Sequence, residues 1–478
     1  MAAPINGSAL ADLDLTSQIF PELPPAVGAR LLRDLQQIPT TSSICVALSG
    51  GLDSLLLLHS VARYRRLIPR VTIRAIHVHH GLSPHADAWA DHCRAECARL
   101  GIELSLVSVQ VGEVQGLGLE AAARQVRYQA FNEQLAEGDV LLLAHHQNDQ
   151  AETLLLNLMR GSGVRGLAGM PRQRRLGQGL LFRPLLDWTR SELEEIARAW
   201  RLTWVEDESN QDEALARNYL RHQVIPALER QWPATVSRIA RSADWCREAD
   251  ELLEELAAED LRRALDDAQS LCLHRLADLS AARQRHLLRY WLQSSGFGFP
   301  GEAGFQRIFT EMLPARVDAE PELRWPGAIL RRYRDRLVLL PELPQATPDL
   351  VLPWDLRQPL QLPQGLLSLQ ALAAGEVNGF GLRQPRPDEV VTVRFRQGGE
   401  VMRPAPSGMR RPLKKLLQEW GVPPWQRNSL PLVYFGDTLA AVPGYAVARE
   451  YLESGAAALV IAWQPVGDKR PGSMGQFD

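Results

Sequence analysis

The residues best suited to chemistry form the run Ser-Gly-Gly-Leu-Asp-Ser at positions 49–54. An apolar run precedes it at 44–48 and another follows at 55–58, which predicts a strand, a tight glycine turn and a helix start. Such a turn points backbone N–H groups at one spot, and the helix dipole adds partial positive charge there. Glycine lets a phosphate approach the backbone, while Ser49 and Ser54 add hydroxyl donors. We therefore interpret residues 49–54 as a phosphate loop.

Asp53 is the unusual member of this loop, because a carboxylate repels a bound anion unless a cation bridges the two. We predict Mg²⁺ between Asp53 and a polyphosphate. The alternative is a plain helix start in which Asp53 interacts favourably with the dipole. The loop is not a Walker A motif, since no Gly-Lys-Ser/Thr follows it and the three lysines of the chain lie near its C-terminus. Phosphate binding must then rest on backbone groups and hydroxyls.

A second cluster, His-His-Gln-Asn-Asp-Gln-Ala-Glu-Thr at 145–153, ends a predicted strand and opens a predicted helix. Asp149 and Glu152 are three residues apart, so both carboxylates fall on one face near the helix start. This acid pair suits either helix capping or the binding of a cationic amine or a metal. The two preceding histidines and the phosphate loop favour a functional role. Zinc is not expected, because no cysteine or third histidine lies at ligand spacing.

Composition restricts the class of protein. A chain of 478 residues is too long for one ordinary core, and 45% hydrophobic with 23% charged residues is typical of soluble globular proteins. We see no membrane span or secretion signal, and five cysteines without framework spacing agree with a reducing compartment. The sequence thus predicts a cytoplasmic protein with no membrane partner. The net charge of −3 means that any nucleic-acid site must be a local patch.

Four apolar strands are predicted at 44–48, 71–78, 102–109 and 140–144, and helical patterns separate them. This alternation predicts an α/β fold with a parallel sheet and helices on both faces. Ligands of such sheets bind beyond the carboxyl ends of the strands. The phosphate loop, the run 77–82 and the cluster 145–152 all follow strands, so we expect them to lie together.

The chain is predicted to divide into several parts. They are an N-terminal catalytic domain at 1–232, an all-α middle domain at 233–345, a proline-rich linker at 346–384, a small α+β C-terminal domain at 385–465 and a disordered tail at 466–478. A short hairpin is expected at 322–340. The Gly/Arg-rich stretch 160–183 is predicted to be a surface loop, whose charge either meets a phosphate backbone or is solvated.

The phosphate loop resembles that of the N-type ATP pyrophosphatases, or PP-loop enzymes, with their adenine nucleotide α-hydrolase-like fold. With further motifs, the chain resembles the tRNA(Ile)-lysidine synthases over about 44–221 and 390–450. The further motifs are 77–82, Leu-Glu-Ala-Ala-Ala-Arg at 119–124 with Arg127-Tyr128, 144–152, Arg-Gly-Ser-Gly at 160–163, Asp-Glu-Ser-Asn at 207–210, Arg217-Asn218 and 410–425. Asn148 departs from the family, which usually has Asp there.

This resemblance implies a ligase that converts the wobble cytidine, position 34, of tRNA(Ile) with a CAU anticodon to lysidine. Its substrates would be ATP and L-lysine, with Mg²⁺. The cytosine 2-carbonyl oxygen would be adenylated with release of diphosphate, and AMP would leave when the lysine ε-amine attacks C2. Decoding would switch from Met (AUG) to Ile (AUA). Whether the chain forms a homodimer stays open.

The resemblance also implies site residues. For ATP and pyrophosphate they are Ser49, Gly50, Gly51, Leu52, Asp53, Ser54 and His77. For catalysis they are Asp53, Asp149, Glu152 and Arg217, with Asp53 as the Mg²⁺ ligand. For lysine they are Asp149, Glu152, Arg217 and Arg124. Arg124 suits a phosphate or a carboxylate, or else a surface ion pair.

The C-terminal region holds many basic residues that face only two acids, Glu400 and Glu419, in our interpretation. We predict that this basic patch binds tRNA, at the acceptor end, and the alternative is a solvated helix face. The predicted tRNA-binding residues are Arg410, Arg411, Lys414, Lys415 and Trp420.

Two other functions fit parts of the sequence. One is another PP-loop tRNA-modifying enzyme, such as a thiolase, or an amidotransferase. Related thiolases use reactive cysteines, whereas Cys93 and Cys97 are four residues apart on a predicted helix, where packing is expected. The other is a non-catalytic tRNA-binding module, against which the intact phosphate loop argues.

Overall fold

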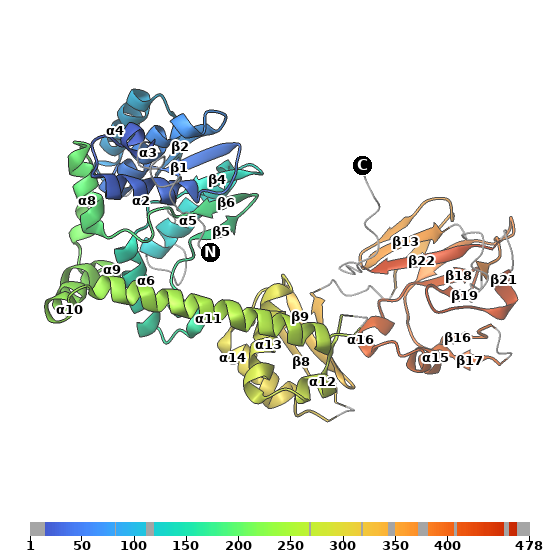
Figure 1. Ribbon diagram of the computed structural model, residues 1–478. Coiled ribbons are helices and arrows are strands. Elements are labelled where there is room, and N and C mark those ends of the chain that lie inside the picture. Colours follow the sequence, from blue (N-terminus) through green and yellow to red (C-terminus); the bar gives the residue numbers. More distant parts are fainter. Residues whose placement is uncertain are drawn as a thin grey trace, which may run out of the picture. The chain divides into compact units, whose positions relative to one another are not determined.

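The computed structural model describes residues 15–81, 83–110, 119–266, 269–316, 319–342, 349–370, 381–405, 409–453 and 458–465. Its contacts divide the chain into two compact units, Met1–Leu253 and Glu254–Asp478, which are described separately (Figure 1). Across the described ranges, no helix combines the length and apolar character needed to cross a bilayer. The predicted tail at 466–478, and Leu82 of the second motif, lie outside the described residues.

The first unit is built on a six-stranded sheet of order β3-β2-β1-β4-β6-β5. All neighbouring pairs are parallel except β5 and β6, which confirms the predicted parallel sheet. Its strands are β1 (Ser43–Ala47), β2 (Thr72–His79), β3 (Glu103–Ser108), β4 (Asp139–Leu142), β5 (Gln173–Leu176) and β6 (Gly179–Phe182). The central strands read as continuous apolar runs because both faces of the sheet are covered.

Helices cover both faces, as predicted. Ile44 and Val46 of β1 join a large core with the helices on one side, and Cys45 joins a smaller core with Phe131 and Leu135 on the other. The helices are α2 (Pro25–Gln36), α3 (Leu52–Tyr64), α4 (Ala86–Leu100), α5 (Leu119–Gln134), α6 (Gln147–Met159) and α8 (Arg190–Ala199). In α3 the apolar run 55–58 is fully buried, and each such leucine stabilises the fold by roughly 1.5–3 kcal/mol. This packing fixes α3, and therefore the loop before it.

The prediction for the Gly/Arg-rich stretch 160–183 was wrong. The stretch was expected to be a surface loop, but it forms the short helix α7 (Val164–Leu167) and the hairpin β5–β6. Leu181 and Phe182 of β6 are buried and pair next to β4, and Arg183 is 2% exposed. The unit ends in η2 (Glu208–Gln211), α9 (Ala216–Tyr219), the π-helical turn η3 (Leu220–Val224) and α10 (Ile225–Gln231).

A long helix, α11 (Thr235–Ala264), runs from the first unit into the second. The middle region continues with β7 (Leu271–Cys272), α12 (Leu273–Ala277), α13 (Ala281–Ser294), α14 (Gly301–Arg307), η4 (Ile308–Met312), β8 (Glu322–Trp325), β9 (Ala328–Tyr333) and β10 (Arg336–Pro341). The hairpin predicted at 322–340 is present. However, its strands and β7 form a four-stranded sheet that packs on the helices, so the middle region is not all-α as expected.

The C-terminal region is a small α+β structure, as predicted. Its strands and helices are β11 (Val351–Pro353), β12 (Leu360–Leu362), β13 (Gly365–Gln370), β14 (Gly381–Leu382), β15 (Val391–Arg394), β16 (Val401–Met402), β17 (Arg411–Pro412), α15 (Leu413–Glu419), α16 (Pro424–Arg427), β18 (Leu432–Phe435), β19 (Thr438–Val442), β20 (Ala446–Val447), η5 (Arg449–Tyr451), β21 (Leu452–Glu453) and β22 (Val460–Pro465). Prolines predicted a linker at 346–384, but β11 pairs with β15 and β13 pairs with β22. The described part of that segment therefore belongs to the C-terminal sheets.

Candidate active site

The phosphate loop is the turn between β1 and α3. Gly50 has φ +88°, and a Cβ there would lie 3.0 Å from Val205 Cγ2 and 3.3 Å from Cys93 Sγ. The Ser54 hydroxyl accepts from the Ser49 N–H at 3.1 Å and donates to the Gly51 carbonyl at 3.0 Å. Serine thus stabilises the turn, and the first-turn N–H groups of α3 have no partner within the helix. The start of α3 thus leaves backbone N–H groups without helical partners, as helix starts that bind anions do.

Asp53 lies in the first turn of α3, and its side chain is 24% exposed. Its Oδ2 contacts Arg190 Nη1 at 2.5 Å and His146 Nε2 at 3.7 Å. Its Oδ1 is buried and has no hydrogen-bond partner. Burial raises the pKa of Asp53, against the opposing effects of His146 and Arg190. One carboxylate oxygen is therefore available for a further cation.

The acid pair lies at the start of α6. Glu152 has no exposed surface, and Arg221 donates to both of its oxygens, from Nε at 2.8 Å and from Nη2 at 3.1 Å. Arg217 Nε lies 3.2 Å from Glu152 Oε2. Burial, followed by the charge of Asp149, raises the pKa of Glu152. Two guanidiniums thus neutralise one buried carboxylate.

Asp149 has the capping role that the sequence allowed, and it also lies close to an arginine. Its Oδ2 accepts from the His146 backbone N–H at 3.1 Å, which caps α6, and its Oδ1 lies 3.6 Å from Arg221 Nη2. Burial alone would raise the pKa of Asp149, but the charges of His146, His145 and Arg217 outweigh it and lower that pKa. Asp149 is therefore ionised at neutral pH.

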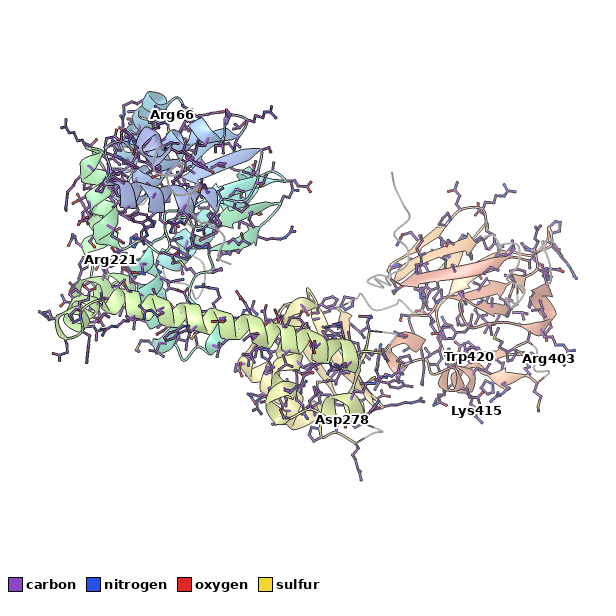
Figure 2. All side chains as sticks on the ribbon, viewed as in Figure 1. Arg66, Arg221, Asp278, Arg403, Lys415 and Trp420 are labelled. Atoms are coloured by element: carbon purple, nitrogen blue, oxygen red, sulfur yellow. The ribbon has the colours of Figure 1, made fainter. Side chains whose placement is uncertain are left out.

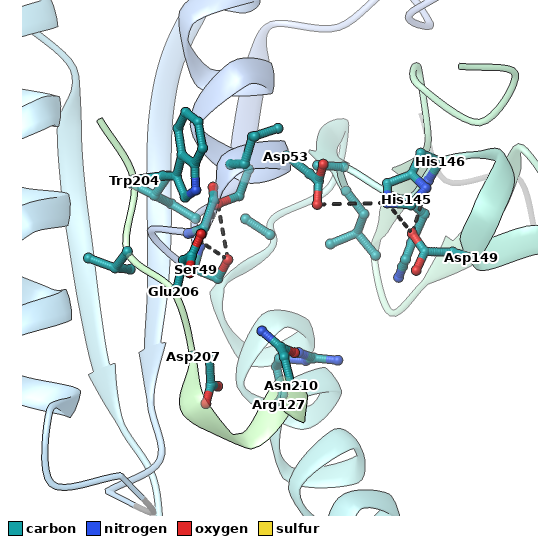
Figure 3. Close-up of a pocket in the computed structure, with 18 of the residues that line it drawn as sticks. Ser49, Asp53, Arg127, His145, His146, Asp149, Trp204, Glu206, Asp207 and Asn210 are labelled. Carbon is teal, nitrogen blue, oxygen red and sulfur yellow. Dashed lines mark hydrogen bonds and ion pairs between the residues drawn. The ribbon is translucent and has the colours of Figure 1, made fainter. Parts of the chain in front are cut away.

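His146 joins the phosphate loop to the acid pair. Its Nε2 lies 3.7 Å from Asp53 Oδ2 and 3.5 Å from Asp149 Oδ2, as the dashed lines of Figure 3 show. These carboxylates come from different helices that begin at neighbouring strands, β1 and β4. The carboxyl ends of the two strands therefore bring the anion site and the acid pair together.

Two arginines, Arg183 and Arg124, contact other side chains around the site. Arg183 Nε donates to His145 Nδ1 at 3.0 Å, and burial, with the charge of Arg183 acting in the same direction, lowers the pKa of His145 to about 3. Arg124 lies over the Tyr128 ring at 5.0 Å and donates to its hydroxyl at 3.4 Å. Arg124 is thus held by an aromatic ring and a hydroxyl, as a residue that can still receive an anion.

Apart from the buried Arg183 and Cys93, the side chains described above line one cavity of about 700 Å³. Figure 3 shows Trp204 and Glu206 beside Ser49, and the Val205 N–H donates to the Gly50 carbonyl at 3.1 Å. Asn218 holds the segment 204–210, because its Nδ2 donates to the carbonyls of Ser209 at 2.8 Å and Asp212 at 2.9 Å. His77 Nδ1 donates to the Leu48 carbonyl at 2.8 Å, so His77 fixes the end of β1 beside the loop.

Comparison with known proteins agrees with this arrangement. Family profiles match residues 26–228 as a "PP-loop domain", 271–338 as a "TilS substrate binding domain" and 391–463 as a "TilS substrate C-terminal domain". The tRNA(Ile)-lysidine synthase of Shigella flexneri is 43% identical over 429 residues, which are 90% of this chain and 98% of that protein. The chain belongs to the tRNA(Ile)-lysidine synthase family.

Other relatives have the same name. The tRNA(Ile)-lysidine synthase of Alkalilimnicola ehrlichii is 44% identical over 439 residues, covering 90% of this chain and 95% of that protein. Among solved structures, a U34-tRNA thiolase from Methanococcus maripaludis is similar with a TM-score of 0.38 and 19% identity, over 50% of this chain and 81% of the thiolase. That distant likeness gives no reason to transfer the thiolase reaction to this lysidine synthase family member.

The structure brings together nearly all the residues that were predicted to bind ATP and lysine. Ser49, Gly51, Leu52, Asp53, Ser54, His77, Arg124, Asp149, Glu152 and Arg217 line the cavity. Gly50 does not line it but shapes the turn. Sequence reasoning missed Arg190 and Arg221 as site residues. Arg221 could have been found, since it follows Arg217 by four residues on one helical face, whereas nothing local marked Arg190.

The basic patch is narrower than predicted. Arg410, Lys414 and Lys415 are exposed, but Arg411 pairs with Glu419. Trp420 stacks on Tyr445 with centroids 5.7 Å apart. Figure 2 marks Lys415, Trp420 and Arg403 in this region.

Two acids that the sequence analysis left out also oppose the basic residues there. Arg394 contacts Asp437 at 3.3 Å and Arg403 lies 4.0 Å from Glu450. Three exposed basic residues of the patch, Arg410, Lys414 and Lys415, therefore lie close together at the start of α15.

Proposed function

We propose that this enzyme forms lysidine at the wobble cytidine of tRNA(Ile) with a CAU anticodon, using ATP and L-lysine and releasing AMP and diphosphate. The observation that carries the proposal is the position of His146, within 3.7 Å of Asp53 and 3.5 Å of Asp149. This contact supports a site in which a leaving diphosphate and an amine would be bound side by side. The names and coverage of the curated relatives support the same reaction.

In the first step, the cytosine 2-carbonyl oxygen attacks the α-phosphorus of ATP and diphosphate leaves. The phosphate loop holds the diphosphate through backbone N–H groups and the Ser49 hydroxyl. Asp53 fits a Mg²⁺ ion, because its buried Oδ1 has no partner and hard cations prefer carboxylate oxygen. The ion, when bound, would offset the charge of the leaving diphosphate. Among the described residues, no group of three His, Cys, Asp or Glu side chains is arranged to hold a metal ion.

In the second step, the lysine ε-amine attacks C2 of the adenylated base and AMP leaves with the former carbonyl oxygen. The acid pair and its two arginines are charges that match a zwitterion. A bound amino acid would offer its ammonium groups to Asp149 and Glu152 and its carboxylate to Arg217 or Arg221. Asp149 is ionised and suits an ammonium, whereas the raised pKa of Glu152 suits a group that accepts the proton lost by the attacking amine.

We also propose that the basic patch binds the tRNA at its acceptor end and that the enzyme works in the cytoplasm, where tRNA and ATP are found. The thiolase alternative has little support from the cysteines. Cys45, Cys93 and Cys97 are buried, and burial raises the pKa of these thiols to about 12, 12 and 11. A thiol that stays protonated is a poor nucleophile.

The test is an assay of pyrophosphate release and labelled lysine incorporation. A tRNA(Ile) transcript with cytidine at the wobble position should support both, and one with uridine should support neither. Asp53→Asn should abolish pyrophosphate release, whereas Asp87→Asn, an exposed acid in the first turn of α4, should leave it unchanged. Incorporation of sulfur or of glutamine nitrogen in place of lysine would overturn the proposal.

A further inference from the structure

Arg190 is the cation that contacts the phosphate loop. It is the first residue of α8, whose start is fixed by Thr189: the Thr189 hydroxyl accepts from the Glu192 N–H at 3.3 Å, and the Thr189 N–H donates to Glu192 Oε2 at 2.7 Å. The Arg190 side chain lies against Asp53 through Nη1 at 2.5 Å and against Glu194 through Nε at 3.1 Å. Its side chain is 38% exposed, into the cavity that the phosphate loop also lines. The guanidinium is therefore accessible to a ligand.

Four other arginines line the cavity: Arg124, Arg127, Arg217 and Arg221. Arg217 and Arg221 pair with Glu152, and Arg124 lies over Tyr128. Burial, followed by the charge of Arg127, lowers the pKa of His80. No lysine of the described ranges lines the cavity. Among the residues that the structure describes, Arg190 is the arginine that forms an ion pair with a side chain of residues 49–54. A triphosphate that enters this loop adds several negative charges next to Asp53. The positive charge of the neighbouring Arg190 can offset them.

We propose that Arg190 is a phosphate-binding residue of this enzyme. In the empty site its guanidinium neutralises Asp53, and when ATP enters it turns to the β- and γ-phosphate oxygens and releases Asp53. A planar guanidinium can donate two parallel hydrogen bonds to a phosphate. The same contacts hold diphosphate after the first step, and Arg190 returns to Asp53 when the diphosphate leaves. This inference rests on the proposed function only in placing ATP at the phosphate loop.

The backbone of Arg190 is held at the acid pair. Its N–H donates to Asn148 Oδ1 at 3.0 Å, and the Gln147 N–H donates to the Trp188 carbonyl at 2.8 Å. The starts of α6 and α8 are thereby joined, so only the Arg190 side chain has to move between carboxylate and phosphate. The contact also gives Asn148 a role that needs an acceptor and no charge.

The test is calorimetric binding of inorganic pyrophosphate, ATP and AMP to the full chain at fixed MgCl₂. Arg190→Ala should weaken pyrophosphate and ATP binding by about 10- to 100-fold, the loss expected for charge-assisted hydrogen bonds. AMP binding should stay unchanged, because AMP lacks the β- and γ-phosphates. Arg190→Lys, which keeps the charge but not the two parallel donors, should bind pyrophosphate with intermediate affinity.

Arg198→Ala is the matched control. Arg198 is on the same helix and contacts the same Glu194, but it is 68% exposed and does not line the cavity. The Arg198→Ala variant should bind pyrophosphate with the affinity of the wild type. The proposal is overturned if Arg190→Ala binds pyrophosphate as tightly as the wild type or more tightly, or if it loses AMP affinity to the same extent. If Arg190→Ala does not fold, a wild-type pyrophosphate affinity of Arg190→Lys overturns it. Lysine incorporation by the wild type is measured separately, so failure of the lysidine reaction is distinguishable from failure of this inference.

Discussion

Glu152 has no exposed surface, and Arg217 and Arg221 both contact its carboxylate. Glu152→Gln removes the charge that these arginines share. The proposed contact between Glu152 and a lysine ammonium is a charge-assisted hydrogen bond, whose loss costs about 1.5–3 kcal/mol, so the KM for lysine should rise by about tenfold or more. Pyrophosphate release in the first step should change little, since the phosphate loop is intact. Steady-state kinetics in both substrates provides the measurement.

The control for this variant is Glu311→Gln. Glu311 also pairs with an arginine, Arg307, but on the surface. Its replacement should leave the KM for lysine and the rate of pyrophosphate release unchanged. A normal KM for lysine in Glu152→Gln would contradict a role of the acid pair in lysine binding.

His145 predicts a pH dependence of stability. Its pKa is lowered by burial to about 3, while an unfolded histidine has a pKa of about 6.5. Between these values the unfolded chain binds a proton that the folded chain does not, so the free energy of unfolding falls as pH falls from about 6.5 towards 3. His145→Gln should lose less stability than the wild type between pH 7 and pH 5 in urea unfolding. His85→Gln, at an exposed histidine, should not differ from the wild type, and an equal decline in His145→Gln would contradict the account.

At the scale of elements, continuous apolar runs were reliable predictors. The strands 44–48 and 140–144 are buried on both faces, so their composition alone identified them. The hairpin β5–β6 was missed because exposed Arg174 and Arg175 interrupt its apolar residues. The linker prediction was wrong because Pro353 lies at the end of a short strand, where proline is tolerated. Local composition does not show which distant strand will pair with such a segment.

The site was predictable where its residues follow the sequence spacing of one helix. Asp149 and Glu152 were found from their separation of three residues. Arg190 could not be found, because 137 residues separate it from Asp53 and only the sheet brings them together. Ion pairs between different elements depend on topology, which spacing does not give.

The joined starts of α6 and α8 provide a prediction for Asn148. Asn148→Asp keeps the acceptor for the Arg190 N–H and should leave the KM for ATP unchanged. Asn148→Leu leaves that N–H without its partner and should raise the KM for ATP by about fivefold to tenfold, since one hydrogen bond contributes about 1 kcal/mol. Asn157→Leu is the control. It removes a contact of the same kind away from α8, that of the Asn157 side chain with the Gly166 carbonyl, and should leave the KM for ATP unchanged. Equal KM values in Asn148→Asp and Asn148→Leu would contradict the anchoring role.

At the scale of the whole molecule, the net charge of −3 gives no sign of the local group of basic residues at the start of α15. The triple variant Arg410→Ala, Lys414→Ala, Lys415→Ala should weaken tRNA binding by at least about tenfold. It should also reduce the slope of log affinity against log salt by about one for each phosphate that the variant no longer neutralises. Filter binding at several salt concentrations provides both quantities.

A matched triple variant replaces Arg94, Arg198 and Arg263 by Ala. These arginines lie outside the matched substrate binding and C-terminal domains, and each already pairs with an acid. Their replacement should leave affinity and salt slope unchanged. Equal effects of the two triple variants would show that the patch has no special role in tRNA binding.

The most direct test of the account follows one oxygen atom. A tRNA(Ile) transcript labelled with ¹⁸O at the 2-carbonyl of its wobble cytidine is incubated with ATP, lysine and the enzyme, and the products are analysed by mass spectrometry. Adenylation at that oxygen, followed by displacement by lysine, predicts one ¹⁸O in AMP and none in diphosphate. Label that stays in the tRNA while lysine is incorporated, or that appears in diphosphate or water, would contradict it.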